Sequence, residues 1–279
     1  MPRCVVVLTD GLRPDAISPG LAPTLSALGD DYVRAVRAST IRPSVTVAAL
    51  ASLATGVSPE THGLVQPGLG FLTGLRRLRP LPAELARYGF RTTVVAGVEG
   101  VAARQIGRAL SACAGVTRMI TTDCGASEVI RAAMAELERP ADELMFVYLS
   151  DCDRAGHAFG WMSDEYLAAV ARVDAAIGAL TARLVDETVM IVSDHGGGGL
   201  EPCDHDRAHP LNERIPLIMA GSRIRRGLAV QREVLLLDVP PTVMAVLGVP
   251  IPAEYEGEPL IEALRHDAPV LSEPMRVAS

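Results

Sequence analysis

The 279-residue chain contains no lysine, so all 26 of its basic residues are arginine. This absence excludes the phosphate-binding P-loop, because the lysine of that motif reaches the phosphates of the nucleotide. We attribute the preference for arginine to the codon usage of a G+C-rich genome. The missing lysine therefore excludes one class of site and says nothing about which chemistry is present.

Long hydrophobic runs are also absent, although 49% of the residues are hydrophobic and the mean hydropathy is +0.26. No stretch of roughly 18 residues, the length that a membrane-spanning helix needs, is free of polar or charged side chains. The first apolar run, in "MPRCVVVLTDG", comes too early and is too short for a signal peptide. We therefore expect a cytoplasmic protein with a large core and no membrane partner.

Cysteine is scarce, and its spacing does not suggest pairing. The five cysteines form no C-x-x-C pair and are odd in number, which fits reduced thiols better than a disulfide framework. The net charge is −7, the pI is about 5.4, and no basic run exceeds two arginines. A nucleic acid polymer is therefore not expected as a partner.

Short β-branched runs alternate with segments rich in alanine and leucine. The strand candidates are continuous apolar runs, typical of strands covered on both faces: Cys4–Thr9, Thr92–Ala96, Leu144–Leu149, Thr188–Ser193 and Ile215–Ala220. The helix candidates are Pro23–Tyr32, Thr46–Ala54, Val101–Ala112, Ala126–Glu138 and Asp164–Val185. This alternation predicts an α/β fold with a doubly wound, mostly parallel sheet and helices on both faces.

No internal repeat or low-complexity linker divides the chain, so we expect a single domain over residues 1–279. The proline- and glycine-rich segment Gln66–Pro82 is the best candidate for an exposed loop or a small cap. It contains "GLGFLTG", which has one residue too many for the dinucleotide-binding fingerprint and follows no clear strand. We interpret this segment as a turn-rich connection.

Acidic and histidine side chains follow three of the expected strands, and two more histidines precede the last one. In chain order these side chains are Asp10, Asp151, Asp153, His157, Asp194, His195, His205 and His209. The carboxyl ends of parallel strands meet at one edge of a sheet, where ligands gather in open α/β folds. We therefore expect these side chains to converge.

Each of these residues also has an ordinary structural explanation, such as a helix cap or a turn. Together, however, several carboxylates beside several imidazoles would repel one another or stay protonated unless a cation lay among them. Their mixed oxygen and nitrogen donors suit Zn²⁺, with Mn²⁺ or Fe as alternatives. The four glycines after His195 would let the backbone and a metal ion approach closely.

The segment "STIRPSVTVAALASLATGVSPETHG" places hydroxyl groups at the start of a helix of small residues. Thr46 opens this expected helix, where the positive N-terminal field would also attract an anion. Ser44 or Thr46 could instead simply cap the helix. The residues alone leave this choice open.

In this order, these segments resemble the alkaline phosphatase superfamily, and in particular its type I phosphodiesterase/nucleotide pyrophosphatase branch. The matching pieces are "DGLRPD", "PSVTVAALASLATGVSPETHG", "DRAGHAFG", "SDHGG", a histidine before "IPLIMAG", and "LLDVPPTVMAVLGVPIPAEYEGEPL". They span nearly the whole chain, and the ordered set is far more specific than any single piece. The resemblance implies an alkaline phosphatase-like fold without the large cap domain that the mutases of this superfamily insert.

The resemblance also implies two divalent metal ions, in the first instance Zn²⁺. One ion would be held by Asp10, Thr46, Asp194 and His195. Thr46 would in addition be the nucleophile, counting back from the Thr-Gly pair that follows the helix.

The second ion would be held by Asp153, His157 and a histidine near the C-terminus. Asp153 is preferred to Asp151 because it has the D-x-x-G-H spacing of the family. His209 is preferred for the last ligand because relatives place it a few residues before the "IP" strand, and His205 is the alternative.

One residue departs from the pattern of the phosphodiesterase branch. Many phosphodiesterase relatives carry an asparagine three residues after the nucleophile, but this chain has Ala49 there. Arg13, Arg42 and His62 are the candidates to bind the substrate in its place. The sulfatase signature C/S-x-P-x-R does not occur in the segment "STIRPSVTV" that carries Thr46, which disfavours sulfate esters.

The resemblance implies hydrolysis of a phosphodiester or pyrophosphate bond in a small, nucleotide-like molecule. The hydroxyl of Thr46, with its pKa lowered beside a metal ion, would attack phosphorus and form a phosphothreonine that water then hydrolyses. A phosphomonoesterase or a phosphonate hydrolase on the same scaffold is the alternative among enzymes. Outside enzymes, the alternative is a metal-bound but inactive binding protein. The sequence does not fix the oligomeric state.

Overall fold

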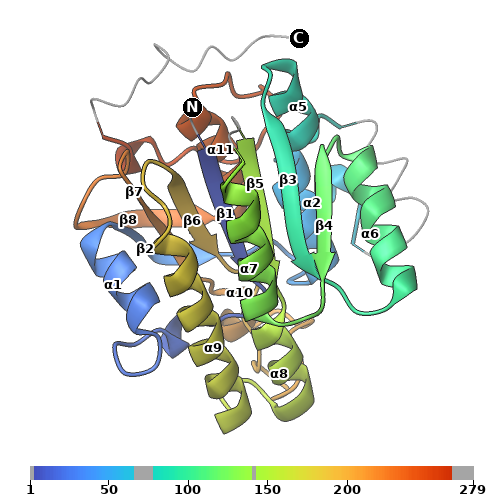
Figure 1. Cartoon of the computed structure of the whole chain (residues 1–279). Coiled ribbons are helices and arrows are strands. Elements are labelled where there is room, and N and C mark those ends of the chain that lie inside the picture. The colour runs from blue at the N-terminus through green and yellow to red at the C-terminus, as the bar shows by residue number, and fades with distance from the viewer. Residues whose placement is uncertain (1–2, 66–77, 140–142, 266–279) are drawn as a thin grey trace.

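Eight strands form the central sheet of the chain, which a computed structural model describes over residues 3–65, 78–139 and 143–265 (Figure 1). The strands are β1 (Arg3–Thr9), β2 (Val33–Ser39), β3 (Arg91–Gly97), β4 (Arg118–Thr122), β5 (Glu143–Leu149), β6 (Thr188–Val192), β7 (Leu217–Gly221) and β8 (Leu228–Leu235). Their order across the sheet is β4-β3-β5-β1-β6-β7-β2-β8. β7 pairs antiparallel with both of its neighbours, and the other pairings are parallel. The predicted mostly parallel sheet is therefore confirmed.

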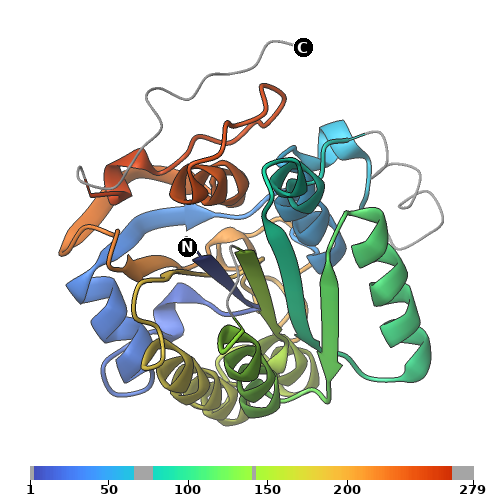
Figure 2. The same cartoon turned by 45° about the horizontal axis from the view of Figure 1, so that its top comes forward.

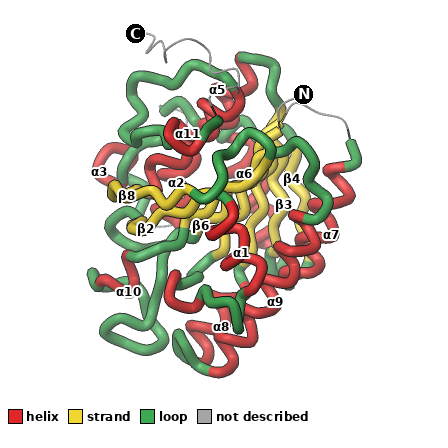
Figure 3. Tube along the Cα trace, turned by 90° about the vertical axis from the view of Figure 1, so that its left-hand side faces the viewer, coloured by secondary structure: helices red, strands yellow, loops and turns green. Residues whose placement is uncertain are grey.

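Helices cover both faces of this sheet (Figure 2, Figure 3). The longer ones are α1 (Pro23–Asp31), α2 (Thr46–Thr55), α5 (Leu81–Arg87), α6 (Val101–Cys113), α7 (Ala126–Leu137), α8 (Asp151–Phe159), α9 (Asp164–Thr181) and α11 (Val239–Leu247). The short ones are η1 (Pro14–Ala16), α3 (Pro59–His62), α10 (Pro210–Glu213), η2 (Leu236–Asp238) and η3 (Ile261–Ala263). One core cluster joins the sheet to α2, α5 and α11, and the other joins it to α1, α7 and α9. The layers are thus helix, sheet and helix, as expected.

β1 shows how a continuous apolar run becomes a central strand. Cys4, Val6 and Leu8 point into the core on the α2 and α11 side, whereas Val5 and Val7 point into the core on the α7 and α9 side. Successive side chains of a strand alternate between the two faces, so a strand covered on both sides is apolar at every position. This is why its sequence shows no alternation.

The strands that the sequence did not predict lie in the outer half of the sheet or at its edge. β2, β4 and β8 contain arginine and several half-exposed positions, so they lack the continuous apolar pattern. The sequence pattern also did not predict α8, because its residues are mostly polar, or α11, because it begins with "VPP". Proline is tolerated in the first turn of a helix, where its missing N–H has no partner to lose.

The register of the central strands sets the position of the site. Thr9 of β1 pairs with Leu149 of β5, and Leu8 pairs with Val192 of β6. The residues that follow these three strands therefore emerge side by side. The backbone N–H of Asp153, in the first turn of α8, also donates to the carbonyl of Asp10 at 3.0 Å.

Two further expectations concern the segments around the sheet. Of the proposed loop Gln66–Pro82, residues 66–77 lie outside the described residues, and Leu81 begins α5. In the part of the chain that the structure describes, we find no helix with the length and apolar character to cross a membrane.

Candidate metal centre

Asp10, Asp194 and His195 form one group of side chains at the carboxyl ends of β1 and β6. His195 Nε2 lies 3.1 Å from Asp10 Oδ1 and 3.6 Å from Asp194 Oδ2, and all three residues are buried. Thr46 Oγ1 lies 3.2 Å from the same nitrogen. The four residues proposed for one metal ion are thus neighbours in space, although they come from three distant parts of the sequence.

The hydroxyl of Thr46 is not used to cap its helix. Thr46 is the first residue of α2, the N-cap is Val45, and no side chain makes a capping hydrogen bond there. The Ser44 hydroxyl instead donates to the carbonyl of His205 at 2.7 Å. Capping by Ser44 or Thr46 therefore does not explain this segment, and the Thr46 hydroxyl faces the acidic group at the positive end of α2.

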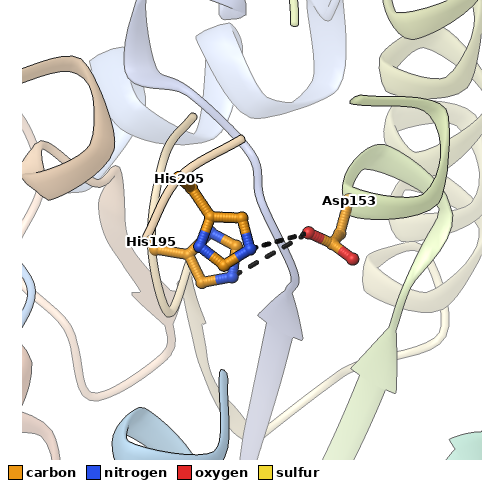
Figure 4. A group of neighbouring side chains, drawn as sticks. All are labelled: Asp153, His195 and His205. Carbon is orange, nitrogen blue, oxygen red and sulfur yellow. Dashed lines mark ion pairs between the residues drawn. The ribbon is translucent and has the colours of Figure 1, made fainter. Parts of the chain in front are cut away.

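Asp153, His195 and His205 form a second group next to the first (Figure 4). Asp153 Oδ1 lies 3.7 Å from His205 Nε2 and 3.9 Å from His195 Nε2. His157 follows Asp153 by one turn of α8, and its Nε2 lies 3.3 Å from Asp153 Oδ1 and 3.2 Å from His205 Nε2. The rings of His195 and His205 stack at 3.7 Å, so the two groups share a boundary.

The geometry reverses the order of preference between His209 and His205. His209 is the N-cap of α10, and its ring accepts a hydrogen bond from the N–H of Leu211. Among the described residues it belongs to neither group. His205 points inward because Asp204 accepts the backbone N–H groups of both His205 and Asp206, which turns the loop.

Backbone carbonyls fix the orientation of all three clustered imidazoles. The Nδ1 atoms of His157, His195 and His205 lie 2.7–2.9 Å from the carbonyls of Cys203, Gly196 and Ser44, respectively. A carbonyl can only accept, so each Nδ1 carries the proton and each Nε2 faces the carboxylates. Histidines that ligate metals are oriented in this way.

Three carboxylate oxygens in these groups are buried without a hydrogen-bond partner: Asp10 Oδ1, Asp153 Oδ1 and Asp194 Oδ2. A buried charge without a partner is strongly unfavourable, and a bound cation removes that cost. Three carboxylates and three imidazole nitrogens also form the mixed donor set that suits Zn²⁺. The residues present therefore fit metal ions.

The titration properties of the site follow from the same crowding. Burial, together with the charge of Asp10, raises the pKa of Asp153 to about 6 and that of Asp194 well above its ordinary range. Burial and the nearby His195 lower the pKa of His205 to about 4. Burial alone would lower the pKa of His195, but the charge of Asp194 and the contact with Asp10 raise it to about 10. In the metal-free protein, protons therefore supply the positive charge that the carboxylates attract.

Tyr148 is a member of the site that the sequence analysis missed. It lies in β5, and its hydroxyl donates to Asp10 Oδ2, so Oδ1 is the oxygen of that carboxylate that faces His195. The signal was a single phenol in the apolar run "LMFVYL", next to β1 in the sheet. A tyrosine that is mostly buried needs a polar partner, and Asp10 provides it.

The structure directs the three proposed substrate-binding residues to other partners. The Arg13 guanidinium binds Asp15 and the carbonyl of Gly197. Arg42 pairs with Glu213 at 2.7 Å, and His62 contacts the Ser52 hydroxyl at 3.0 Å on the buried side of α2.

The position of the family's asparagine is apolar in this chain. Ala49 is fully buried in the core. The amide of Asn212, the one asparagine of the chain, instead binds the N–H of Gly199 and the carbonyl of Arg207.

Several solved structures share this architecture. A protein in the alkaline phosphatase superfamily from Vibrio parahaemolyticus superposes with a TM-score of 0.70 at 16% identity, over 89% of this chain and 66% of that one. The phosphonate monoester hydrolase from Silicibacter pomeroyi superposes with a TM-score of 0.71 at 15% identity, over 98% of this chain and 78% of that one. At 15–16% identity, these superpositions establish a shared fold only.

The sequence match is more specific. The family model for type I phosphodiesterase / nucleotide pyrophosphatase matches residues 4–69 and 99–249, and the chain belongs to this family. The 2,3-bisphosphoglycerate-independent phosphoglycerate mutase of Saccharophagus degradans is 29% identical over 147 residues, 50% of this chain and 27% of that protein. Human arylsulfatase K is 31% identical over 104 residues, 34% of this chain and 19% of that protein. The chain spans less than a third of the length of these curated relatives. The match to the family model confirms the resemblance to the type I phosphodiesterase/nucleotide pyrophosphatase branch.

Proposed function

We propose that the protein is a two-metal phosphoester hydrolase that acts through Thr46 on a phosphodiester or pyrophosphate bond of a small, nucleotide-like molecule. One observation carries this proposal. The Thr46 hydroxyl lies 3.2 Å from His195 Nε2, within a set of buried carboxylates whose free oxygens have no hydrogen-bond partner. Family membership supports the same reaction class.

Two divalent ions fit the two groups, Zn²⁺ first, with Mn²⁺ or Fe as alternatives. Asp10, Thr46, Asp194 and His195 would hold one ion, and Asp153, His157 and His205 the other. Bound there, the ions would supply Lewis-acid chemistry, lowering the pKa of the Thr46 hydroxyl and offsetting the charge of the phosphoryl oxygens.

The chain supplies the nucleophile and its orientation. Thr46 Oγ1 would attack phosphorus, the bond to the departing oxygen would break, and a phosphothreonine would form. Water would then hydrolyse this ester and regenerate the hydroxyl. The first-turn N–H groups of α2 would stabilise the anionic phosphoryl group, because they have no partners within the helix.

The nucleophile is tested by a matched pair of substitutions. Thr46→Val keeps the shape of the side chain and removes the hydroxyl, whereas Thr46→Ser keeps the hydroxyl. We expect Thr46→Val to reduce turnover of a generic phosphoester by at least about 1,000-fold, Thr46→Ser to retain measurable turnover, and both to bind metal. Mass spectrometry of the acid-quenched wild-type reaction should find a phosphoryl group on the peptide that contains Thr46. A Thr46→Val variant as active as wild type would refute the assignment.

The substrate class is tested by comparing rates on simple nitrophenyl esters. A phosphodiesterase should prefer bis-p-nitrophenyl phosphate to p-nitrophenyl phosphate, and the reverse order would favour a phosphomonoesterase. Preference for p-nitrophenyl phenylphosphonate would favour a phosphonate hydrolase, and p-nitrophenyl sulfate serves as the sulfatase control. Two tightly bound ions without turnover of any ester would favour an inactive binding protein.

A further inference from the structure

Trp161, the one tryptophan of the chain, lies against the histidine side of the metal centre. Its ring meets His157 edge-on at 5.1 Å and His205 edge-on at 5.6 Å between centroids. The indole N–H donates to the carbonyl of Gly11 at 2.8 Å, and Gly11 follows Asp10. One buried side chain therefore contacts both histidines beside Asp153 and the segment that carries a ligand of the other group.

Glycines from two motifs make room for this indole. A Cβ on Gly197 would lie 2.1 Å from the ring, and a Cβ on Gly156 would lie 2.5 Å from it. A Cβ on Gly198 would lie 2.7 Å from the Cβ of Trp161. Gly156 precedes His157 in "DRAGH", and the other two belong to the run after His195. Two of the four glycines that we expected to admit a metal ion, Gly197 and Gly198, thus admit a tryptophan.

The backbone around Trp161 is also bent to place the ring. Gly160 has a φ of 94°, and Met162 has a φ of 68°. Within the described part of the chain, Met162 is the one non-glycine residue with a positive φ. The N–H of Trp161 donates to the carbonyl of Pro202 at 2.9 Å, next to the loop that carries His205. A conformation that side chains rarely adopt is retained only where the surrounding structure imposes it.

We propose that Trp161 is a positioning residue that holds His157 and His205 for the divalent ion bound with Asp153. This inference rests on the proposed function, because it requires that the site binds metal. The His157 side chain is 46% exposed, and its contacts are the Cys203 carbonyl, the indole and the neighbouring ligands. Without the indole, its ring would lose the packing that limits its rotation, and the second ion would bind to a less ordered pair of imidazoles.

Metal titration of the full-length, metal-free protein tests this role without measuring activity. Trp161→Phe keeps an aromatic ring and removes the N–H, whereas Gly197→Ala keeps the indole and displaces it. We expect either change to weaken Zn²⁺ binding in the Asp153 group by about 10-fold to 100-fold and to weaken binding in the Asp10 group much less. The absorption spectrum of the Co²⁺-loaded protein should shift in both variants. Gly20→Ala is the matched control, because a Cβ on Gly20 would meet no other atom within 4 Å.

The outcomes separate this inference from the proposed function. If wild type binds no metal, the proposed function fails. If wild type binds two ions and both variants retain its affinities and Co²⁺ spectrum, the role of Trp161 is refuted. Equal weakening of both ions, accompanied by a lower Tm, would make Trp161 merely structural and would also refute the proposal.

Tryptophan fluorescence gives a second measurement that needs no substitution at Trp161. The whole emission arises from one indole in contact with His157 and His205. We expect the emission of wild type to change when Zn²⁺ fills the Asp153 group, and the same titration of His157→Gln to show no such step. If calorimetry detects two bound ions but the tryptophan emission does not change on adding Zn²⁺, the proposed contact is contradicted.

Discussion

Replacing Asp153 by asparagine tests the electrostatics of the metal-free site. Burial, reinforced by the charge of Asp10, raises the pKa of this carboxyl from 3.8 to about 6, and the side chain is 16% exposed. Because the folded-state pKa lies above the unfolded one, the stability that this group contributes is complete below pH 3.8 and is lost as the pH rises through about 6. At about 1.4 kcal/mol for each pH unit, the full loss is roughly 3 kcal/mol.

Nearly half of this loss falls in an accessible pH range. Between pH 5 and pH 7 the ionisation of Asp153 should remove about 1.4 kcal/mol from the free energy of unfolding of the metal-free protein. Asp153→Asn cannot ionise there and should lack this component. Because Asp153 is coupled to Asp10 and His195, the difference between the two pH profiles reports on Asp153 together with its interaction with these neighbours.

Urea denaturation of the chelator-treated protein at several pH values measures the effect. Asp123→Asn, at a side chain that is 91% exposed, is the control and should keep the wild-type pH dependence. Saturating Zn²⁺ should stabilise wild type more at pH 7 than at pH 5, because the proton on Asp153 competes with the ion. Identical metal-free profiles for wild type and Asp153→Asn would show that this carboxyl is not forced to hold a proton, and the reasoning would fail.

Three other changes have defined outcomes. Tyr148→Phe removes the hydrogen bond to Asp10 and should weaken metal binding in that group by about 10-fold, measured by Zn²⁺ calorimetry, with little change in Tm; an unchanged affinity would exclude an orienting role. Asp174→Ala should destabilise the protein by about 1–3 kcal/mol in urea, because this buried carboxylate accepts the N–H groups of Thr24 and Leu25 at the start of α1; activity per folded molecule should stay the same. Exhaustive chelation should abolish turnover and lower the Tm, and both should return on adding Zn²⁺; turnover that survives chelation would contradict a metal-dependent reaction.

The central part of the sheet and one half of the site could be predicted from the sequence. Continuous apolar runs identified β1, β3, β5 and β6, because strands covered on both faces are apolar throughout. Once those strands are parallel, Asp10 and Asp194 must emerge at the same edge. The helix that begins at Thr46 was also predicted, but it was the resemblance to the family, and not the residues alone, that placed the Thr46 hydroxyl beside these carboxylates.

The choice between His205 and His209 could not be predicted, because it depends on a loop. The resemblance to the family favoured His209, the histidine nearer to β7, whereas the structure uses that ring as the cap of α10. The inward turn of His205 comes from the hydrogen bonds of Asp204, which act over one and two residues and leave no periodic pattern. The sequence also did not predict the position of Trp161, because the residues that contact it come from separate motifs.

Ser44 and His205 are tied to each other by two hydrogen bonds in opposite directions. The Ser44 hydroxyl donates to the carbonyl of His205, and the ring of His205 donates to the carbonyl of Ser44, each at 2.7 Å. Ser44 stands two residues before Thr46, so the loop of one group and the start of α2 behave as one mechanical unit. Binding at the two places would then be linked: an oxyanion bound at Thr46 would raise the affinity for the neighbouring cation, and the cation would raise the affinity for the oxyanion by the same factor.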